Sequence, residues 1–327
     1  MKRPLMAAAA LLATFGAAAQ PMPLITTYGV MDAGMARIRS GAPRGKVQFA
    51  SASMMNNGTS RFGLQAQENV GRGLAVGFRF ETGIDLKDGA TTYSAFWARQ
   101  ANVWLGGKWG AVRVGRQLAP SYEALYAFEV TGDAGYSALV NTYGYAGMPA
   151  RLDSAISFTS ARVDGWQTTI AVASKNNTGS RGDVWDVGMT YEERAQAGRR
   201  WSAGIALNQG ADGTGRLNWQ AGARYELSQS LRERLALAAS YTRRQLDNSR
   251  ARREGMSLGL LMRSGSVHMA LDVVRDRKNE TPGHAGKKHT NAVLEGRYYM
   301  SPRSFIYAAA LRLDGKNNWG VGLRYNF

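Results

Sequence analysis

Hydrophobic and polar residues alternate along most of this 327-residue chain, and the alternation is strictest over residues 318–327. Every second residue there is large and apolar: Trp319, Val321, Leu323, Tyr325 and Phe327. A period of two residues predicts a β-strand with one apolar and one polar face. A strand that ends on an aromatic residue is typical of the closing strand of a membrane β-barrel, whose outward side chains meet lipid. The alternative is the final strand of a soluble β-sandwich.

The same alternation recurs along the chain in segments of about ten residues, joined in turn by short and by longer polar connections. A helical pattern is excluded because apolar residues recur at i+2 and not at i+3 and i+4. The chain therefore predicts an all-β protein, a transmembrane antiparallel β-barrel of about 16 strands. The expected strands cover residues 25–35, 61–67, 74–81, 98–107, 112–117, 154–160, 166–174, 183–192, 201–208, 218–226, 235–243, 256–263, 267–275, 290–299, 304–313 and 319–327.

One connection, residues 117–150, is longer than the others and shows no sustained alternation. Loops of this length are usually functional or disordered. This one is rich in aromatic and small residues, which can pack against another surface. We therefore expect it to fold back into the lumen of the barrel.

The N-terminus has the pattern of a secretory signal peptide. Lys2 and Arg3 precede a short apolar run over residues 5–15, and an Ala-x-Ala cleavage site follows at Ala17 and Ala19. We expect residues 1–19 to be removed, which leaves residues 20–327 as the barrel. No later segment has the roughly 18 consecutive apolar residues that a transmembrane helix requires.

The composition narrows the possible partners. The chain has 41 Lys and Arg residues against 24 Asp and Glu, a formal net charge of +17, and no Cys. Disulfides and thiol chemistry are thereby excluded. Nucleic acid is not a predicted partner, because the basic residues are scattered and no nucleic-acid-binding motif is present. A surface or lumen that attracts small anions fits the charge better.

Candidate catalytic and metal-binding chemistry is sparse. His268 and Asp272 lie four residues apart on an expected strand, about 13 Å from each other, which is too far for a hydrogen bond. His284 and His289 belong to a basic loop, and no metal-binding spacing is present. We predict no metal, no cofactor and no enzymatic activity. The alternatives are an outer-membrane hydrolase and a secreted or outer-membrane all-β binding protein such as an adhesin.

Three motifs in order resemble those of a known family. They read Thr-Tyr-Gly-Val-Met-Asp-Ala-Gly at residues 27–34, Ser-Arg-Phe-Gly-Leu at 60–64 and Val-Arg-Val-Gly-Arg-Gln at 112–117. Over essentially the whole mature chain the sequence resembles the general porins of Gram-negative outer membranes, nearest the beta-proteobacterial type. Phe327 matches as well, and with Tyr325 it would form the signal read by the barrel-assembly machinery.

The resemblance implies a homotrimer of sixteen-stranded barrels in the outer membrane, in contact with its lipid and lipopolysaccharide. It implies a third loop folded inward and passive diffusion of small hydrophilic solutes. In that family, arginines of the wall face acidic residues or carbonyls of the inward loop. The basic balance of this chain adds the expectation that small anionic solutes are preferred.

Motif position and strand phase together give the candidate constriction residues. Arg61 and Arg116 match wall arginines, and Arg99 is a third candidate. Arg61, Arg79 and Glu81 have inward phase, whereas Arg99 and Arg116 are in phase with apolar residues expected to face lipid. Either a bulge shifts the phase of these two residues near the rim, or their assignment to the constriction is wrong.

The long loop supplies the opposing charges in this prediction, through Glu123, Glu129 and Asp133. Ser157 stands where the family often has a further Arg, which makes a fully basic constriction a weaker expectation.

Overall fold

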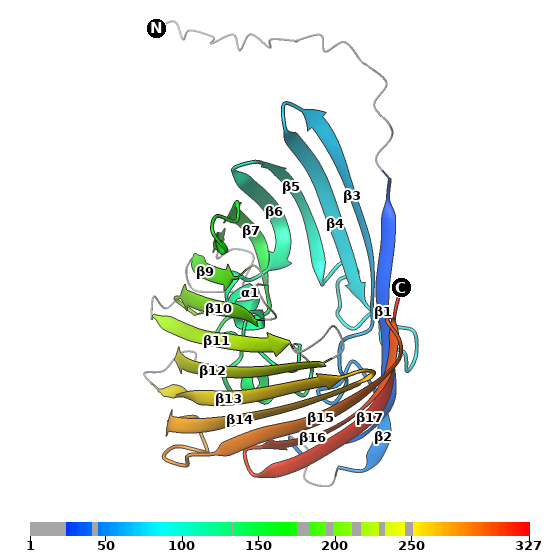
Figure 1. The fold of residues 1–327 in the computed structure, drawn as a ribbon, viewed down its shortest axis with the longest axis vertical. Helices are drawn as coiled ribbons and strands as arrows, with labels where there is room; N and C mark the ends of the chain where they lie inside the picture. The colour runs from blue at the N-terminus through cyan, green and yellow to red at the C-terminus, as the bar shows by residue number, and fades with distance from the viewer. Residues whose placement is uncertain are drawn as a thin grey trace, which may run out of the picture.

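The structure, a computed structural model, describes residues 24–40, 45–132, 134–174, 183–193, 199–210, 217–228, 233–245 and 251–327. The expected signal peptide, residues 1–19, lies outside this range. In the described part of the chain, seventeen strands form one sheet whose successive strands lie side by side around a wall (Figure 1). The strands are β1 (Thr26–Arg37), β2 (Val47–Ser51), β3 (Arg61–Gly71), β4 (Leu74–Gly83), β5 (Gln100–Gly107), β6 (Gly110–Leu118), β7 (Arg151–Ser160), β8 (Trp166–Ala173), β9 (Val184–Glu192), β10 (Arg199–Asn208), β11 (Asn218–Ser228), β12 (Glu233–Gln245), β13 (Arg252–Ser264), β14 (Val267–Asn279), β15 (Thr290–Ser301), β16 (Ser304–Leu313) and β17 (Lys316–Asn326).

Strand β1 closes the sheet into a barrel. One edge of β1 pairs with β17, from Val30 opposite Asn326 to Arg37 opposite Trp319. Its other edge pairs first with β3 and then with the short β2, so that these two strands share one position in the wall. The pairings are antiparallel, and the wall is sixteen strands wide, which confirms the predicted all-β barrel. The short strand β2 was not predicted.

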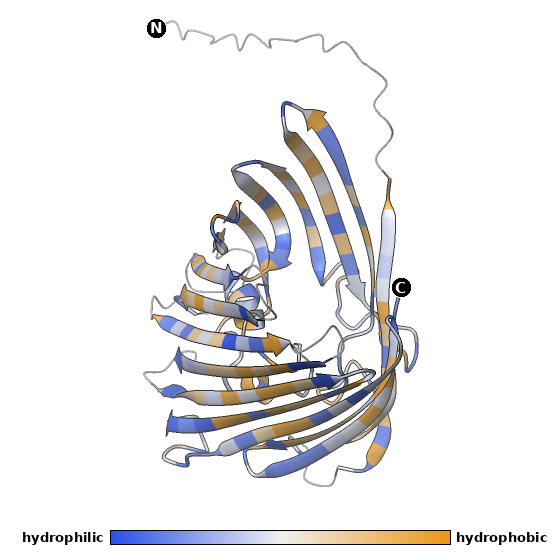
Figure 2. Ribbon diagram, in the orientation of Figure 1, coloured by the Kyte–Doolittle hydropathy of each residue, from blue (hydrophilic) through white to orange (hydrophobic). Residues whose placement is uncertain are grey.

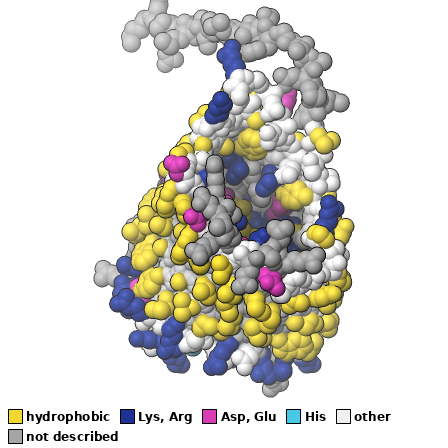
Figure 3. Space-filling model, viewed as in Figure 1, with side chains coloured by type: hydrophobic (Ala, Val, Ile, Leu, Met, Phe, Trp, Pro, Cys, Tyr) yellow, Lys and Arg dark blue, Asp and Glu magenta, His cyan; other side chains and the backbone are white. Residues whose placement is uncertain are grey.

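The two faces of the wall differ as the alternation predicts. On β12 and β13, Leu237 and Leu258 point outward and are 56% and 64% exposed. Ser240 and Ser257 point inward, where their hydroxyl oxygens lie 2.7 Å apart. Figure 2 shows the alternation along the ribbons, and Figure 3 shows hydrophobic side chains spread over the outer surface. None of the described helices is long and apolar enough to cross a membrane.

The connection between β6 and β7 contains two short helices, α1 (Pro120–Tyr126) and α2 (Ala138–Tyr143), which lie on the concave side of the wall (Figure 1). Inward-facing glycines make room for this segment, because a Cβ atom at each would collide with it. In this way Gly188 meets Pro120, Gly204 meets Ala124, Gly222 meets Phe128 and Gly259 meets Val130. The close approach therefore depends on small residues of the wall.

A second segment, residues 52–60 between β2 and β3, also packs on the inner face. Asp32 of β1 accepts hydrogen bonds from the Asn56 side chain and the Gly58 backbone, both at 2.9 Å. It also accepts one from the Tyr307 hydroxyl at 2.6 Å. This buried carboxylate therefore holds the segment against β1 and β16.

The closure also involves the C-terminal aromatic residue. Gly29 and Phe327 exchange two backbone hydrogen bonds, of 3.0 and 3.1 Å. The Phe327 ring occupies the space that a Cβ atom at position 29 would need. The terminal aromatic residue thus adds both ladder bonds and a ring to the β1–β17 junction.

We expect Phe327→Ala to lower the amount of assembled barrel in the membrane fraction several-fold, because the substitution removes this ring from the closing junction. The measurement is the amount of protein whose gel mobility changes on boiling, a property of closed barrels. Trp319→Ala is the matched control, since Trp319 is an outward aromatic residue of the same strand with 39% exposure against 41% for Phe327. Equal yields of the two variants would contradict a special role for the terminal residue.

Candidate functional site

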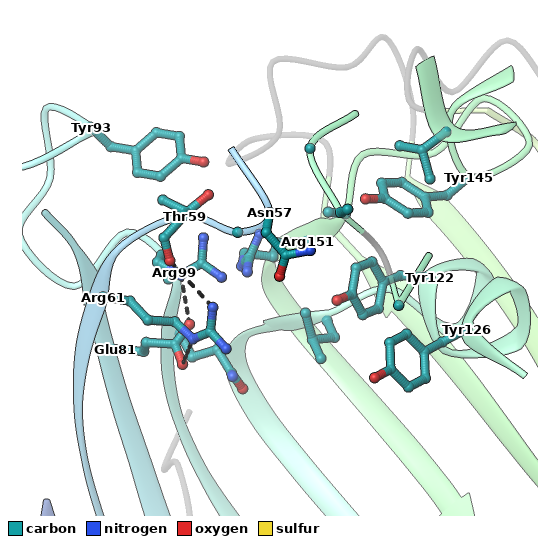
Figure 4. A pocket seen from close by; sticks show the side chains of 18 of the residues that line it. Asn57, Thr59, Arg61, Glu81, Tyr93, Arg99, Tyr122, Tyr126, Tyr145 and Arg151 are labelled. Atoms are coloured by element: carbon teal, nitrogen blue, oxygen red, sulfur yellow. Dashed lines mark hydrogen bonds and ion pairs between the residues drawn. The ribbon is translucent and has the colours of Figure 1, made fainter. Parts of the chain in front are cut away.

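A cavity of about 500 Å³ lies inside the barrel, between the inner wall and the β6–β7 connection. Its charged lining comes from five different strands or strand ends. The residues are Arg61 on β3, Arg79 and Glu81 on β4, Arg99 just before β5, Arg151 at the start of β7 and Arg324 on β17. Figure 4 shows several of these side chains converging from one side of the cavity.

Glu81 is the centre of the charged cluster. Its Oε1 accepts a hydrogen bond from Arg99 Nε at 2.7 Å, and its Oε2 lies 3.6 Å from Arg61 Nε. The Tyr28 hydroxyl donates a further hydrogen bond to Oε2 at 3.0 Å. Because Glu81 is the one carboxylate among the described residues that line the cavity, positive charge exceeds negative charge there.

Two of the other arginines, Arg79 and Arg324, are held by neutral partners. Arg79 donates to the Gln65 side-chain oxygen through Nε at 3.2 Å and Nη2 at 2.7 Å. Arg324 donates to the Asn57 side-chain oxygen at 2.7 Å. Neutral acceptors orient a guanidinium without cancelling its charge, so both side chains add positive charge to the cavity.

Tyrosines form much of the rest of the lining. Tyr122 and Tyr126 lie four residues apart on α1 and therefore share one face of that helix. Tyr145 follows α2, and its ring centroid is 5.0 Å from that of Tyr122. Tyr93 comes from the β4–β5 connection. The opposite face of α1, with Pro120 and Ala124, is buried against the wall.

The structure thus brings together four of the predicted site residues: Arg61, Arg79, Glu81 and Arg99. Arg99 reaches the inner side because it precedes the regular part of β5, where strand phase no longer applies. Its backbone N–H donates to the Glu81 carbonyl at 3.0 Å, and its side-chain Nε donates to the Glu81 carboxylate at 2.7 Å.

Arg116 lies elsewhere, and it does not line the cavity. It sits at an irregularity between Gly115 and Gln117, where the pairing of β6 with β7 shifts register. Its side chain donates to the Ala98 carbonyl and pairs with Asp153 near the rim. In the pairing of β5 with β6, Arg116 lies opposite Ala101 and Val114 lies opposite Val103, so Arg116 keeps the outward phase of Val114.

The acidic residues of the loop are also set apart from the cavity. Glu123 faces β8, where Thr169 donates to it at 3.4 Å. Burial raises the pKa of Glu123, although the charge of Arg113 acts in the opposite direction. Glu129 accepts hydrogen bonds from the hydroxyls of Thr131 and Ser137, within its own loop. Asp133 lies outside the described residues.

Arg151 and Arg324 were not among the predicted site residues. The inward phase of Arg324 within residues 318–327 was a signal that could have found it. Arg151 carried no such signal, because it stands at the beginning of a strand next to an irregular loop. Ser157, where a further arginine was considered, donates to the Gln117 side chain at 2.5 Å and holds it inside the wall.

An ion-pair cluster, made of Arg253, Asp276 and Asp314, holds α2 near one rim of the barrel. Arg253 donates to both oxygens of Asp276 at 2.9 Å and to Asp314 at 2.6 Å. The Tyr143 hydroxyl at the end of α2 lies 3.2 Å from Asp276, and Asn291 bonds both Thr142 and Asp314. The cluster therefore joins the loop to β13, β14 and the β16–β17 turn.

A family model described as Gram-negative porin matches residues 6–318 of the chain. The sequence is 34% identical to outer membrane porin protein 32 of Delftia acidovorans over 138 residues, 41% of this chain and 37% of that protein. It is 27% identical to an outer membrane porin protein of Bordetella pertussis over 212 residues, 60% of this chain and 54% of that one. The chain thus spans about half or less of the length of these curated relatives.

Among solved structures, the fold is similar to that of an anion-selective porin from Comamonas acidovorans. The TM-score is 0.71 at 20% sequence identity, and the similarity covers 93% of this chain and 100% of the other. At this identity the likeness concerns the fold alone.

The ion-pair cluster should make the stability of the barrel depend on pH in the acid range. Partial burial acts to raise the pKa of Asp314, but the hydrogen bond and the charge of Arg253 outweigh it, so that this pKa lies below its ordinary value. A lowered pKa stabilises the folded state above the ordinary pKa, and this stabilisation is lost as the pH falls. We expect the temperature at which heating changes the gel mobility to fall as the pH drops from about 5 to about 3. In Asp314→Asn, which lacks the titrating carboxyl group, this temperature should fall by less over the same pH range.

Asp164→Asn is the matched control for this measurement. Asp164 also lies in a turn with positive φ, 49° against 47° for Asp314, a conformation that Asn adopts readily. The prediction is wrong if acidification lowers the gel-shift temperature of Asp314→Asn and of Asp164→Asn by the same amount.

Proposed function

The chain belongs to the Gram-negative porin family, and from this membership we propose that it forms a water-filled channel for passive diffusion across the outer membrane. The observation that carries the proposal is the charged cavity inside a closed barrel, bordered by wall and loop. An outer surface of exposed apolar residues and an inner surface of polar residues suit a barrel surrounded by lipid. Family membership makes the protein a channel and not an enzyme.

The proposed channel prefers small anions. Five guanidinium groups and one carboxylate line the cavity among the described residues. In a narrow passage through a low-dielectric wall, such an excess of fixed charge attracts counter-ions strongly. The fold similarity to a porin described as anion-selective supports the same preference.

We propose that the β6–β7 connection narrows the channel and that Arg61, Arg79, Arg99 and Glu81 line its narrowest part. The contacts of α1 and α2 with inward-facing residues support this placement. Arg116, Glu123 and Glu129 would then support the constriction from the rim and from within the loop, without facing the solute.

Processing and assembly complete the proposal. Residues 1–19 would be removed on export, and residues 20–327 would insert as the barrel with Tyr325 and Phe327 read by the barrel-assembly machinery. The outer face would contact lipid and lipopolysaccharide. A homotrimer is the proposed assembly, and the native mass of the detergent-solubilised protein distinguishes a trimer from a monomer.

A measurement of ion selectivity tests whether the charges of the cavity decide which ions pass. We expect Arg61→Glu to move the reversal potential in a KCl gradient toward cations far more than Lys287→Glu does. Arg61 lies 3.6 Å from Glu81 inside the barrel, whereas Lys287 is exposed on a connection. Salt screens exposed charges within about 8 Å at physiological ionic strength.

Arg61→Gln serves as a second variant in case a glutamate beside Glu81 hinders assembly, and it should shift selectivity in the same direction by a smaller amount. Equal shifts for Arg61→Glu and Lys287→Glu would mean that selectivity arises from the overall field of the protein.

Conductance tests whether α1 borders the path. A Cβ atom at Gly204 would lie 1.9 Å from the carbonyl oxygen of Ala124, a backbone atom that cannot turn aside. We expect Gly204→Val to push α1 toward the lumen, to lower single-channel conductance and to destabilise the barrel by about 1–3 kcal/mol. Gly296→Val is the control, because a Cβ atom there meets nothing within 4 Å. Wild-type conductance in an assembled Gly204→Val barrel would show that α1 lies away from the ion path.

A further inference from the structure

The two sides of the cavity carry different chemistry. On the wall side, Arg61, Arg99 and Arg151 gather around Glu81. On the loop side, Tyr122, Tyr126 and Tyr145 lie across from these arginines with their hydroxyl ends directed toward them (Figure 4). A solute passing between loop and wall therefore meets guanidinium groups, with the Tyr93 phenol beside them, on one side and the three phenols of the loop on the other (Figure 4).

The wall side is built to bind a carboxylate. A guanidinium is permanently charged and presents only donors, in a planar arrangement that matches two carboxylate oxygens. The Nε atom of Arg151 is buried and has no hydrogen-bond partner among the described residues. An anion next to Arg151 would be attracted by the positive charge and could accept hydrogen bonds from the N–H groups of the guanidinium.

The loop side is built for hydroxyl groups. A phenol hydroxyl both donates and accepts, so it can bond a solute hydroxyl in either direction, which an arginine cannot. Tyr126 is 54% exposed although it lies inside the barrel. Its position one helical turn from Tyr122 extends the row of phenols along α1. The apolar ring below each hydroxyl can also contact the C–H groups of a solute.

We propose that the cavity favours polyhydroxy monocarboxylates, the chemical class of the sugar acids, over unsubstituted carboxylates of the same length. The carboxylate would lie on the arginine side and the hydroxyl-bearing carbons along the tyrosines of the loop. A cavity of about 500 Å³ is within the range of about 300–1,000 Å³ that holds small ligands. This inference rests on the proposed channel function and deepens it, because it names the solute class of the same site.

The test compares gluconate with hexanoate, two six-carbon monocarboxylates that differ in their hydroxyl groups. Each acid is titrated against the chloride current of single channels in a planar bilayer, and the concentration that halves the current gives an apparent affinity. We expect gluconate to bind more tightly than hexanoate in the wild-type channel. Calorimetric titration of the folded protein in detergent gives the same comparison without requiring any current.

The decisive variant is the double substitution Tyr122→Phe with Tyr126→Phe, which removes two hydroxyls and leaves both rings in place. A neutral hydrogen bond contributes about 0.5–1.5 kcal/mol, so the gluconate-over-hexanoate ratio should fall roughly two- to tenfold for each bond lost. Tyr298→Phe is the matched control, because Tyr298 is 52% exposed but lies on the outer face. It should leave the ratio unchanged, whereas Arg151→Gln should weaken both acids together.

The outcomes separate this inference from the channel proposal. Equal affinities of the wild-type protein for the two acids would overturn the inference, and so would an unchanged ratio in the double variant, even in a channel that is anion-selective in KCl. A channel without anion preference would overturn the proposed selectivity, and the calorimetric ratio would still decide whether the tyrosines recognise hydroxyl groups.

Discussion

The structure depends on one constraint, the need to pair every backbone N–H and C=O group of a sheet that is surrounded by lipid. An unpaired group in the hydrocarbon region costs several kcal/mol, so the sheet cannot have a free edge. Strand β1 satisfies the constraint by pairing with β17 on one edge and with β3 and β2 on the other. The shared edge explains why seventeen strands make a wall of sixteen positions.

Closure leaves the inner face as the place where polar side chains and loops can gather. The helices α1 and α2 are too short to be stable alone, since isolated helices below about 12 residues are marginal in water. Their positions come from the wall, through glycines that allow close contact and through buried polar anchors. Asp186, for example, accepts two hydrogen bonds from Ser121 at the start of α1, of 2.5 and 2.9 Å. The face of α1 that carries the tyrosines is thereby turned toward the cavity.

The sequence alone predicted the strands of the wall better than the segments that pack inside the barrel. Alternate side chains of each strand face lipid and lumen, so a period of two residues in the sequence marks the strands directly. The inward phase of Arg61, Arg79 and Glu81 could be predicted for the same reason. Long-range contacts have no such period. The short strand β2 and the helices α1 and α2 are defined by contacts with residues far away in the chain. Arg99 was ambiguous for the same reason, because its direction is set by pairing with Glu81 and not by its own strand.

The same distinction between local pattern and long-range contact governs the electrostatics. The net charge of +17 counts every residue equally, although many basic residues lie on exposed connections where water and salt reduce their influence. The charges that act on a solute are those held inside the wall, and there the ratio of guanidinium to carboxylate groups matters more than the total. Glu81 compensates Arg61 and Arg99 in part, and Gln65 and Asn57 hold Arg79 and Arg324 without compensating them. The cavity therefore keeps an excess of positive charge because Arg79 and Arg324 are held by amide oxygens and not by further carboxylates.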